Sequence, residues 1–491
     1  MKKKFLNILF CLFIFLGFLA FCSAYWYEDV YGDVGFDSIL FTLLSEMDGV
    51  QTGLLWNYLL NGFLPCVILS GAVIFVLFVP LKNGKPLVAL KEVFNRLIAG
   101  VVALSLVMGG AFLVKLPSWA VAKFHRTNLF ETEFVSPKTV DIIFPEEKRN
   151  LIYIYLESME TTYFSTEQGG AMENSLMPNL YSISAENLNF SHTNEVGGGR
   201  HMTGATWTIA AMVAQTSGLP LKLPIGIDKN SYSEYSKFLP GATTVTDILN
   251  ENGYYQALMV GSDAVFGGRH KYFTQHSIDR VYDIYTAYED QIVEDGHWVW
   301  WGMEDMYLFE YAKQELTEIS KKDEPFSFSL LTVDTHFVDG CVCEKCDDVY
   351  TEQYENVISC SDKQVFEFVQ WIKEQPFYEN TTVIITGDHL TMDDNYIERT
   401  AGDDFDRRLY NCILNPAVDT VYDKNRDFTT FDMFPTTLAS IGCEIEGERL
   451  GLGTNLFSGE KTLTEKYGAD YINAELNKMS DYYNKKILNA Y

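Results

Sequence analysis

The stretch Asn150-Leu-Ile-Tyr-Ile-Tyr-Leu-Glu157-Ser158 contains six apolar residues in a row and ends in a carboxylate. A continuous apolar run of this length is typical of a strand that is buried on both faces of a parallel sheet. Ligands of open α/β sheets bind just beyond the carboxyl ends of such strands. Glu157 therefore has two interpretations from this stretch alone, a polar residue that closes a core strand or a functional carboxylate.

Further apolar runs and helix-like stretches alternate after this strand. We predict strands over Tyr254–Val260, Phe326–Val333 and Thr382–Thr386, and helices over Met306–Lys321 and Lys363–Glu374. This alternation indicates an α/β domain with a mostly parallel sheet and helices on both faces. We expect this domain to occupy residues 149–491.

The first 117 residues read as a membrane anchor with about three transmembrane helices. The run Phe5–Phe21 follows Met-Lys-Lys-Lys, which is typical either of a cleaved signal peptide or of a first transmembrane helix. We favour the retained helix because two further apolar runs follow, over Phe63–Val79 and Leu97–Leu113. Glycine and alanine in the third run allow close packing of helices.

Positive charges set the expected orientation of this anchor. Lys82, Lys85, Lys91 and Arg96 lie between the second and third runs, and such an excess marks a cytoplasmic connection. Everything after about residue 118 is then extracytoplasmic, which predicts a multi-pass protein of the cell membrane. We expect residues 118–148 to form a linker with an amphipathic segment, Trp119–Phe130. A second short amphipathic piece, Phe41–Leu44, is expected at the membrane surface.

Charge and cysteine content limit the classes of partner and site. The net charge of −29 argues against nucleic-acid binding, which needs a basic face to neutralise phosphates. Four of the nine cysteines are crowded together: Cys341, Cys343, Cys346 and Cys360. The run Cys341-Val-Cys-Glu-Lys-Cys346 has zinc-like spacing, but no second cluster with matching His/Cys spacing accompanies it. We therefore favour one or two disulfides that brace a loop.

Acidic and imidazole side chains follow three of the predicted strands. Glu157 ends the first, Asp388-His389 follows Val383-Ile-Ile-Thr-Gly, and His336 ends Thr332-Val-Asp-Thr-His. Carboxylates and imidazoles at neighbouring strand ends are the ligands that a divalent cation requires. Together these three strand ends predict a metal site at the carboxyl edge of the sheet.

A threonine-rich stretch offers a nucleophile for that site. Glycines 197–199 lead toward Thr206-Trp-Thr208 and then into a run of good helix formers. The free N–H groups and dipole at a helix amino terminus favour a bound phosphate. A threonine hydroxyl beside a cation has a lowered pKa and can attack phosphorus. The alternative is that these threonines only cap the helix.

Taken together, the motifs resemble those of membrane-anchored phosphoglycerol transferases in the sulfatase/alkaline-phosphatase superfamily. The similarity is greatest to periplasmic-glucan phosphoglycerol transferases, and lipoteichoic acid synthases look like more distant relatives. The stretches that carry the resemblance are Asn150–Glu160, Trp207–Gln215 with Gly218-Leu-Pro-Leu221, Leu330–His336, Gly387-Asp-His-Leu390 and Gly451-Leu-Gly453. The resemblance implies an alkaline-phosphatase/sulfatase-like fold from about residue 150 to 458.

The resemblance also implies roles for individual residues. Glu157, Asp388 and His389 match metal ligands, and a nucleophilic threonine completes the set. The cation is expected to be Mn²⁺, with Mg²⁺ or Zn²⁺ as alternatives. His336 and Arg269 match residues that bind the phosphoryl or glycerol oxygens of the substrate.

Some features depart from the family pattern. Gly267 stands where the synthases have an aromatic residue before the arginine, which puts glycerol packing in question. Alignment from Gly218-Leu-Pro selects Thr208 as nucleophile, whereas alignment on Met212 selects Thr206, and we choose Thr208. No Cys-x-Pro-Ser-Arg stretch is present to supply the formylglycine of true sulfatases, which argues against sulfate-ester hydrolysis.

The function that the resemblance implies is phosphoglycerol transfer through a covalent threonine intermediate. The donor would be phosphatidylglycerol, diacylglycerol would leave, and the acceptor would be a glycan or a polyol-phosphate polymer. Two alternatives stay open at this point. One is a phosphoethanolamine transferase that acts on lipid or glycan, and the other is a catalytically silent protein that binds headgroups.

Overall fold

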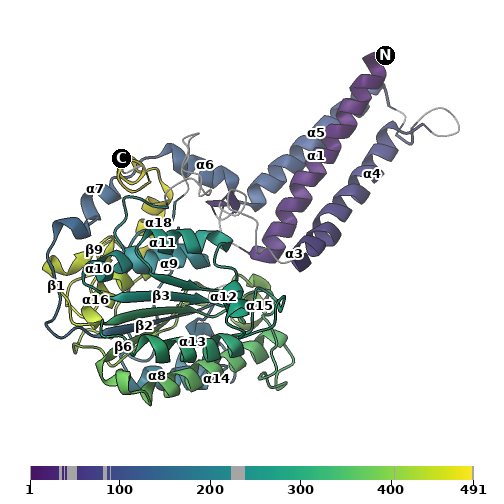
Figure 1. Ribbon diagram of the computed structural model, residues 1–491. Helices are drawn as coiled ribbons and strands as arrows, with labels where there is room; N and C mark the ends of the chain where they lie inside the picture. The colour runs from purple at the N-terminus through teal and green to yellow at the C-terminus, as the bar shows by residue number, and fades with distance from the viewer. Residues whose placement is uncertain are drawn as a thin grey trace. The chain divides into compact units, whose positions relative to one another are not determined.

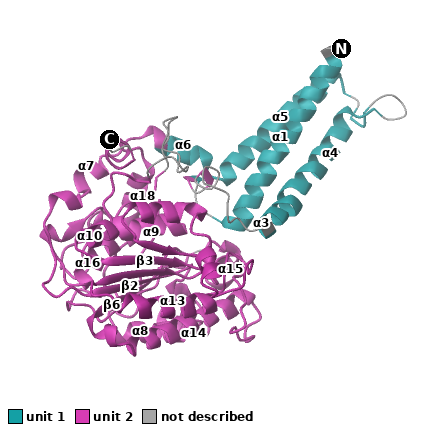
Figure 2. Ribbon diagram, in the orientation of Figure 1, with its two compact units in different colours: residues 1–36, 50–122 teal, residues 37–49, 123–491 magenta. Residues whose placement is uncertain are grey.

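The computed structural model describes residues 2–32, 36–37, 39–40, 52–80, 86–88, 90–222, 238–402 and 404–488. The chain divides into two compact units (Figure 2). Unit 1 contains residues 1–36 and 50–122, and unit 2 contains residues 37–49 and 123–491. The predicted piece Phe41–Leu44 and the residues Lys82 and Lys85 lie outside the described residues.

Unit 1 is helical. Among its described residues, three helical segments are long and apolar enough to cross a membrane: Lys3–Tyr31, Gly53–Phe78 and Glu92–Leu113. The first is α1 (Lys2–Tyr31) and the third is α5 (Glu92–Leu113). The second consists of α3 (Thr52–Asn57), the π-helical η1 (Tyr58–Phe63) and α4 (Leu64–Phe78) in succession.

Small residues bring α1 and α5 close together, as the composition of the third run predicts. A Cβ at Gly17 would lie 2.9 Å from Ala103 Cα, and one at Gly110 would lie 3.0 Å from the Ala20 carbonyl oxygen. Both distances are shorter than ordinary packing allows, so only glycine permits this separation of the two helices.

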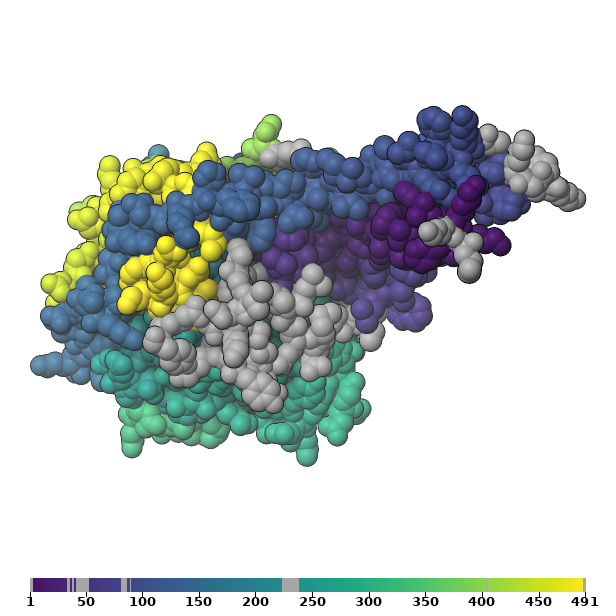
Figure 3. Space-filling view, turned by 90° about the horizontal axis from the view of Figure 1, so that it is seen from above, coloured from purple at the N-terminus to yellow at the C-terminus, as the bar shows by residue number. Residues whose placement is uncertain are grey.

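The predicted amphipathic segment Trp119–Phe130 is not one helix. It is divided between α6 (Leu116–Phe124) and α7 (Leu129–Glu133). The backbone between them pairs with Met479 instead of continuing the helix, since Thr127 N donates to the Met479 oxygen at 2.9 Å and Met479 N donates to the His125 oxygen at 3.0 Å. The carboxyl-terminal segment therefore lies beside residues 125–127 (Figure 3).

Unit 2 is built on a mostly parallel sheet, which confirms the predicted fold class. Its described residues place six strands in the order β4-β3-β5-β2-β6-β7, and β7 alone is antiparallel to its neighbour (Figure 1). The predicted strands agree with the observed ones to within two residues. The strands in sheet order are Arg280–Tyr282, Tyr255–Val260, Phe326–Leu331, Asn150–Leu156, Thr381–Gly387 and Asn411–Leu414.

Helices cover both faces of this sheet because its central strand is apolar on both sides. Tyr153 and Tyr155 of β2 pack in one core cluster, whereas Ile152 and Ile154 pack in a second cluster. The first cluster includes residues of α9 (Thr208–Ser217), α10 (Val245–Glu251) and α16 (Met433–Ser440). The second includes residues of α8 (Pro178–Glu186), α13 (Asp305–Ile319) and α14 (Gln353–Lys373).

Helix α14 begins ten residues before the predicted start at Lys363. The added turns bury Tyr354, Val357 and Ile358, which recur at helical spacing and face the core. The other α-helices among the described residues of unit 2 are α11 (Arg269–Gln275), α12 (Ile284–Glu289), α15 (Asp394–Thr400), α17 (Leu463–Tyr467) and α18 (Ala469–Asn477). Two short antiparallel pairs join β1 (Ile142–Ile143) to β8 (Glu444–Ile445) and β9 (Arg449–Leu450) to β10 (Gly453–Thr454).

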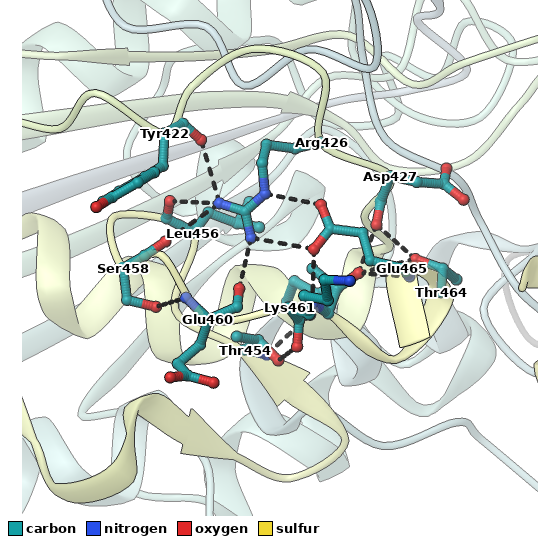
Figure 4. A network of polar contacts seen from close by, with 12 residues as sticks. Tyr422, Arg426, Asp427, Thr454, Leu456, Ser458, Glu460, Lys461, Thr464 and Glu465 are labelled. Atoms are coloured by element: carbon teal, nitrogen blue, oxygen red, sulfur yellow. Dashed lines mark hydrogen bonds and ion pairs between the residues drawn. The ribbon is translucent and has the colours of Figure 1, made fainter. Parts of the chain in front are cut away.

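The buried guanidinium of Arg426 holds the segment after β10 in place through hydrogen bonds. Arg426 Nε donates to Glu465 Oε1 at 2.7 Å, and its Nη atoms donate to backbone carbonyl oxygens (Figure 4). Those oxygens belong to Tyr422, Leu456, Ser458 and Glu460. Because every side of the guanidinium is occupied, this network has a structural role.

Candidate active site

The carboxyl edge of the sheet brings Glu157, Asp388 and His389 together. Leu156 of β2 is paired with Gly387 of β6, so the residues that follow each strand emerge side by side. One ligand atom of each of the three lies within 4.8 Å of the others. His389 Nε2 is 3.3 Å from Glu157 Oε1 and 3.5 Å from Asp388 Oδ2, and all three side chains are buried.

Tight backbone packing fixes this edge. A Cβ at Gly387 would lie 1.9 Å from the Met159 carbonyl oxygen, so only glycine allows β6 to approach the turn after β2. In that turn Ser158 has a left-handed φ of 55°, a conformation unusual for a residue with a side chain. Its N–H donates to Asp388 Oδ1 at 2.9 Å, as does the N–H of His389 at 2.7 Å.

The second carboxylate oxygen of Asp388 is buried and accepts no hydrogen bond from the described residues, and it forms an ion pair with His389 Nε2 at 3.5 Å. An unsatisfied buried carboxylate oxygen is costly, and a bound cation would satisfy it. The His389 ring is oriented so that it could bind a cation. Its Nδ1 lies 2.8 Å from the Leu390 carbonyl oxygen, and its Nε2 faces the two carboxylates. Two carboxylates, one imidazole and a nearby hydroxyl suit Mn²⁺, Mg²⁺ or Zn²⁺.

The charges of the cluster shift all three pKa values. Burial acts to raise the pKa of Glu157, but the imidazoles of His389 and His336 lower it to about 2. Burial and the charge of Glu157 raise the pKa of Asp388 to about 7. Burial acts to lower the pKa of His389, but Asp388 and Glu157 raise it to about 10. A proton on His389 thus offsets the paired carboxylates, which is a role that a cation can take over.

Thr208 is the first residue of α9, and its hydroxyl points at the cluster. Thr208 Oγ1 lies 3.3 Å from Glu157 Oε2 and 3.4 Å from His389 Nε2. The helix begins with the bond from Ala211 N to the Trp207 oxygen, so the N–H groups before it have no acceptor within the helix. The described hydrogen bonds include none between Thr206 and the cluster, so the geometry favours Thr208 over Thr206.

Arg269 begins α11 and is buried. Its Nη2 donates to Ser262 Oγ at 2.9 Å and to the Asp263 oxygen at 2.7 Å, and these bonds fix the plane of the guanidinium. Burial lowers the pKa of Arg269 to about 10, against the opposing charges of Glu157 and Asp388. Those charges act on Arg269 because it lies beside the cluster, and even with this pKa the side chain is a cation at neutral pH.

His336 follows β5 in a loop that is tied to the cluster. Thr335 Oγ1 donates to the Glu157 carbonyl oxygen at 2.6 Å, and His336 Nδ1 lies 2.8 Å from the Phe337 oxygen. Burial lowers the pKa of His336, although the charge of Glu157 opposes this shift. The ring centroid of His336 lies 4.5 Å from that of Trp301. The structure therefore brings all the predicted residues to one edge of the sheet.

Two further side chains near the site are absent from the sequence-based prediction. Trp301 packs against both His336 and Phe266, and its indole Nε1 is buried without a described partner. His201 has a buried Nδ1 without a described partner, and burial together with Arg407 and His389 lowers its pKa to about 3. His201 follows the glycines that lead toward Thr208, so its position in the sequence could have marked it as a candidate site residue.

The chain is similar in sequence to known proteins. The family described as Sulfatase matches residues 149–410. The protein named phosphoglycerol transferase I from Salmonella choleraesuis is 29% identical over 469 residues, covering 91% of this chain and 56% of that protein. Its namesake from Citrobacter koseri is 30% identical over 331 residues, covering 64% and 40%. The chain thus spans about half the length of the curated relatives it matches.

Two solved structures align with much of the chain. The lipoteichoic acid synthase LtaP from Listeria monocytogenes aligns with a TM-score of 0.49 at 20% identity, over 65% of this chain and 79% of that one. The lipooligosaccharide phosphoethanolamine transferase A from Neisseria meningitidis aligns with a TM-score of 0.49 at 12% identity, over 89% of this chain and 84% of that one.

Proposed function

The chain belongs to the sulfatase family, and we propose that it transfers phosphoglycerol from phosphatidylglycerol to an extracytoplasmic acceptor by way of Thr208. The observation that carries this proposal is the position of the Thr208 hydroxyl, at 3.3 Å from Glu157 and 3.4 Å from His389. The relatives named phosphoglycerol transferase I support the choice of the transferred group.

In this proposal Glu157, Asp388 and His389 hold a divalent cation, with Mn²⁺ as the proposed ion. When bound, such a cation lowers the pKa of a neighbouring hydroxyl and neutralises charge on a phosphoryl group. The unsatisfied Oδ2 of Asp388 and the orientation of His389 Nε2 support this assignment. Glu157 Oε2 also accepts the hydrogen bond of the Thr208 hydroxyl, which orients that oxygen for attack.

The reaction would proceed in two displacements. Thr208 Oγ1 loses its proton and attacks the phosphorus of phosphatidylglycerol, and the bond between phosphorus and the diacylglycerol oxygen breaks. Diacylglycerol leaves with a proton, and glycerophosphate stays on Thr208. An acceptor hydroxyl then attacks the phosphorus, loses its proton and displaces the threonine, which is protonated again.

Positive charge and hydrogen-bond donors around Thr208 would stabilise the phosphoryl oxygens in both steps. Arg269 supplies a guanidinium whose plane is fixed by Ser262 and Asp263. The N–H groups in the first turn of α9, which have no acceptor within the helix, would supply donors and the positive end of the helix dipole. His336 supplies an imidazole whose Nδ1 is engaged by its own loop, so its Nε2 can face the substrate.

The three apolar helical segments of unit 1 would keep the enzyme at its lipid donor. We propose a multi-pass anchor in the cell membrane, with the catalytic unit on the extracytoplasmic side. Lys91 immediately precedes the third span, and Arg96 lies near its start. These two positive charges support this orientation. The acceptor would be a glycan or a polyol-phosphate polymer.

The experiment is to incubate the full-length protein in lipid vesicles with headgroup-labelled phosphatidylglycerol, Mn²⁺ and candidate acceptors. We expect diacylglycerol release, and label on one acceptor. Thr208→Ala should abolish release, and Thr206→Ala is the matched control that should retain it. If phosphatidylethanolamine is consumed in place of phosphatidylglycerol, the proposed donor is wrong. If Thr208→Ala keeps full activity, the proposed nucleophile is wrong.

A further inference from the structure

Three cysteines form a cluster apart from Glu157, Asp388 and His389. Cys343 and Cys346 lie in the loop between β5 and α14, and Cys360 lies on α14 itself. Cys343 Sγ is 3.7 Å from Cys346 Sγ and 3.8 Å from Cys360 Sγ. A disulfide bond is about 2.05 Å long, and all nine cysteines are free. The described residues, which include all nine cysteines, therefore contain a group of thiols in place of the disulfides that we expected from the sequence.

The distances between these sulfur atoms match those around one zinc ion. A tetrahedral zinc ion binds thiolates at about 2.3 Å, which separates neighbouring sulfur atoms by about 3.8 Å. Each of the three cysteines offers a sulfur within 4.8 Å of the other two. Cys343 and Cys346 have the two-residue spacing common in zinc sites, and α14 brings the third ligand from fourteen residues later. The sequence places Cys360 in the crowded group of cysteines but does not show that its sulfur lies beside the other two.

Nitrogen donors surround the three sulfur atoms. Cys343 N donates to Cys346 Sγ at 3.3 Å, and the backbone N–H groups of Lys345 and Cys346 donate to the sulfur of Cys343. Gln364 Nε2 lies 3.5 Å from Cys360 Sγ and 3.8 Å from Cys343 Sγ. Donors directed at sulfur stabilise thiolates, which are the form that binds metal.

The amide group of Gln364 is oriented toward the sulfur atoms of the cluster. Its Oε1 is buried and has no partner among the described residues, while its Nε2 contacts two thiols. An amide in this environment would gain more from an ordinary oxygen acceptor than from a neutral thiol, which accepts only weakly. Thiolates on a cation are acceptors strong enough to account for its orientation.

We propose that Cys343, Cys346 and Cys360 bind a zinc ion, with water in the fourth coordination position. The ion would join the loop that leaves β5 to the first half of α14, and this loop also contains His336. Its protein ligands are all sulfur, whereas Glu157, Asp388 and His389 offer oxygen and nitrogen. The two sites thus favour different cations, because thiolates select softer metals than carboxylates do.

Cobalt substitution tests this proposal without relying on enzymatic activity. The full-length protein would be purified with a reductant, stripped of metal and titrated with Co²⁺. Cobalt bound by thiolates gives an intense near-ultraviolet charge-transfer band, which a site of carboxylates and imidazole does not give. We expect one equivalent of Co²⁺ to produce this band, and Zn²⁺ to displace it.

Two variants locate the band. Cys360→Ser should remove most of its intensity. Cys341→Ser is the matched control, because Cys341 is a buried cysteine two residues from Cys343 but lies outside the three-sulfur group, and the band should remain. Asp388→Asn, which alters the other site, should also keep the band.

Three results would overturn the proposal. The first is the absence of the band from the wild-type protein when its thiols are reduced, a result that does not depend on any variant folding. The second is an undiminished band in folded Cys360→Ser. The third is a disulfide between two of the three cysteines, found by alkylation without reduction in protein isolated from cells. These readouts are independent of phosphoglycerol transfer, so they do not depend on the proposed function.

Discussion

Arg407→Ala should destabilise the protein more than any exposed charge change, because its partner is a fully buried carboxylate. Glu160 accepts hydrogen bonds from Arg407 Nε at 2.9 Å, from Arg407 Nη2, from Thr162 Oγ1 and from Thr391 N at 3.1 Å. Arg407 also donates to the Thr391 carbonyl oxygen at 2.9 Å. This pair therefore links the turn after β2 to the loop that follows His389.

The magnitude follows from the burial of the two partners. Removing one member of a buried ion pair costs about 3–5 kcal/mol. The side chain of Arg407 is 17% exposed and that of Glu160 is 0% exposed, so water can reach part of the space that the guanidinium leaves. We therefore expect a loss of about 3 kcal/mol, at the lower end of that range. Glu157 and His389 should also bind metal about 10–100-fold more weakly, because this ion pair links the two segments that carry them.

The assay is urea unfolding of the metal-free full-length protein in detergent, followed by tryptophan fluorescence, with a separate Mn²⁺ titration. Arg399→Ala is the matched control, because the Arg399–Glu352 pair at 3.3 Å is about half exposed on both sides. That control should cost no more than about 1 kcal/mol. In a double-mutant cycle with Glu160→Gln, the coupling should exceed about 1 kcal/mol. Additive effects of the two changes, or a loss from Arg407→Ala that equals the control, would refute this reasoning.

Other predictions concern the site itself. Thr208→Ser should keep activity within about tenfold, whereas Thr208→Ala should lose at least about 10³-fold in diacylglycerol release, because only serine preserves the hydroxyl. In chelator-treated protein, stability should fall as pH rises from 6.5 toward 10, because folding raises the pKa of His389 to about 10 and the folded state holds that proton more tightly. His389→Gln should flatten this slope in urea unfolding, and an unchanged slope would contradict the assignment. Gly387→Ala should yield no folded protein by circular dichroism, because its Cβ would lie 1.9 Å from the Met159 oxygen and neither backbone can shift cheaply. Arg269→Lys should lower kcat/KM by about 10–100-fold, since a lysine cannot reproduce a guanidinium held by Ser262 and Asp263, and wild-type kinetics would remove it from the substrate site.

The sheet and the candidate metal ligands at its carboxyl edge were predictable because they depend on local sequence patterns. The apolar run before Glu157 predicts a fully buried strand, and residues that follow parallel strands emerge at one edge whatever the details of the helices. The same logic placed Asp388, His389 and His336 together. These predictions needed only strand identity and direction.

Features that depend on pairing between distant segments were not predictable in this way. The break between α6 and α7 arises because the backbone of residues 125–127 pairs with Met479, more than 350 positions later. Trp301 reaches His336 through a loop with no regular structure, so no periodicity points to it. The third thiol of the cysteine cluster needed the early start of α14, which depends on burial of Tyr354 in the core.

The most direct test of the central claim is a search for the covalent intermediate. The protein would be mixed with headgroup-labelled phosphatidylglycerol without an acceptor, quenched in acid, digested and analysed by mass spectrometry. Our account predicts one phosphoglycerol group on Thr208, formed in step with diacylglycerol release and absent from Thr208→Ala. Diacylglycerol release with an unmodified Thr208, or label on Thr206 instead, would contradict it.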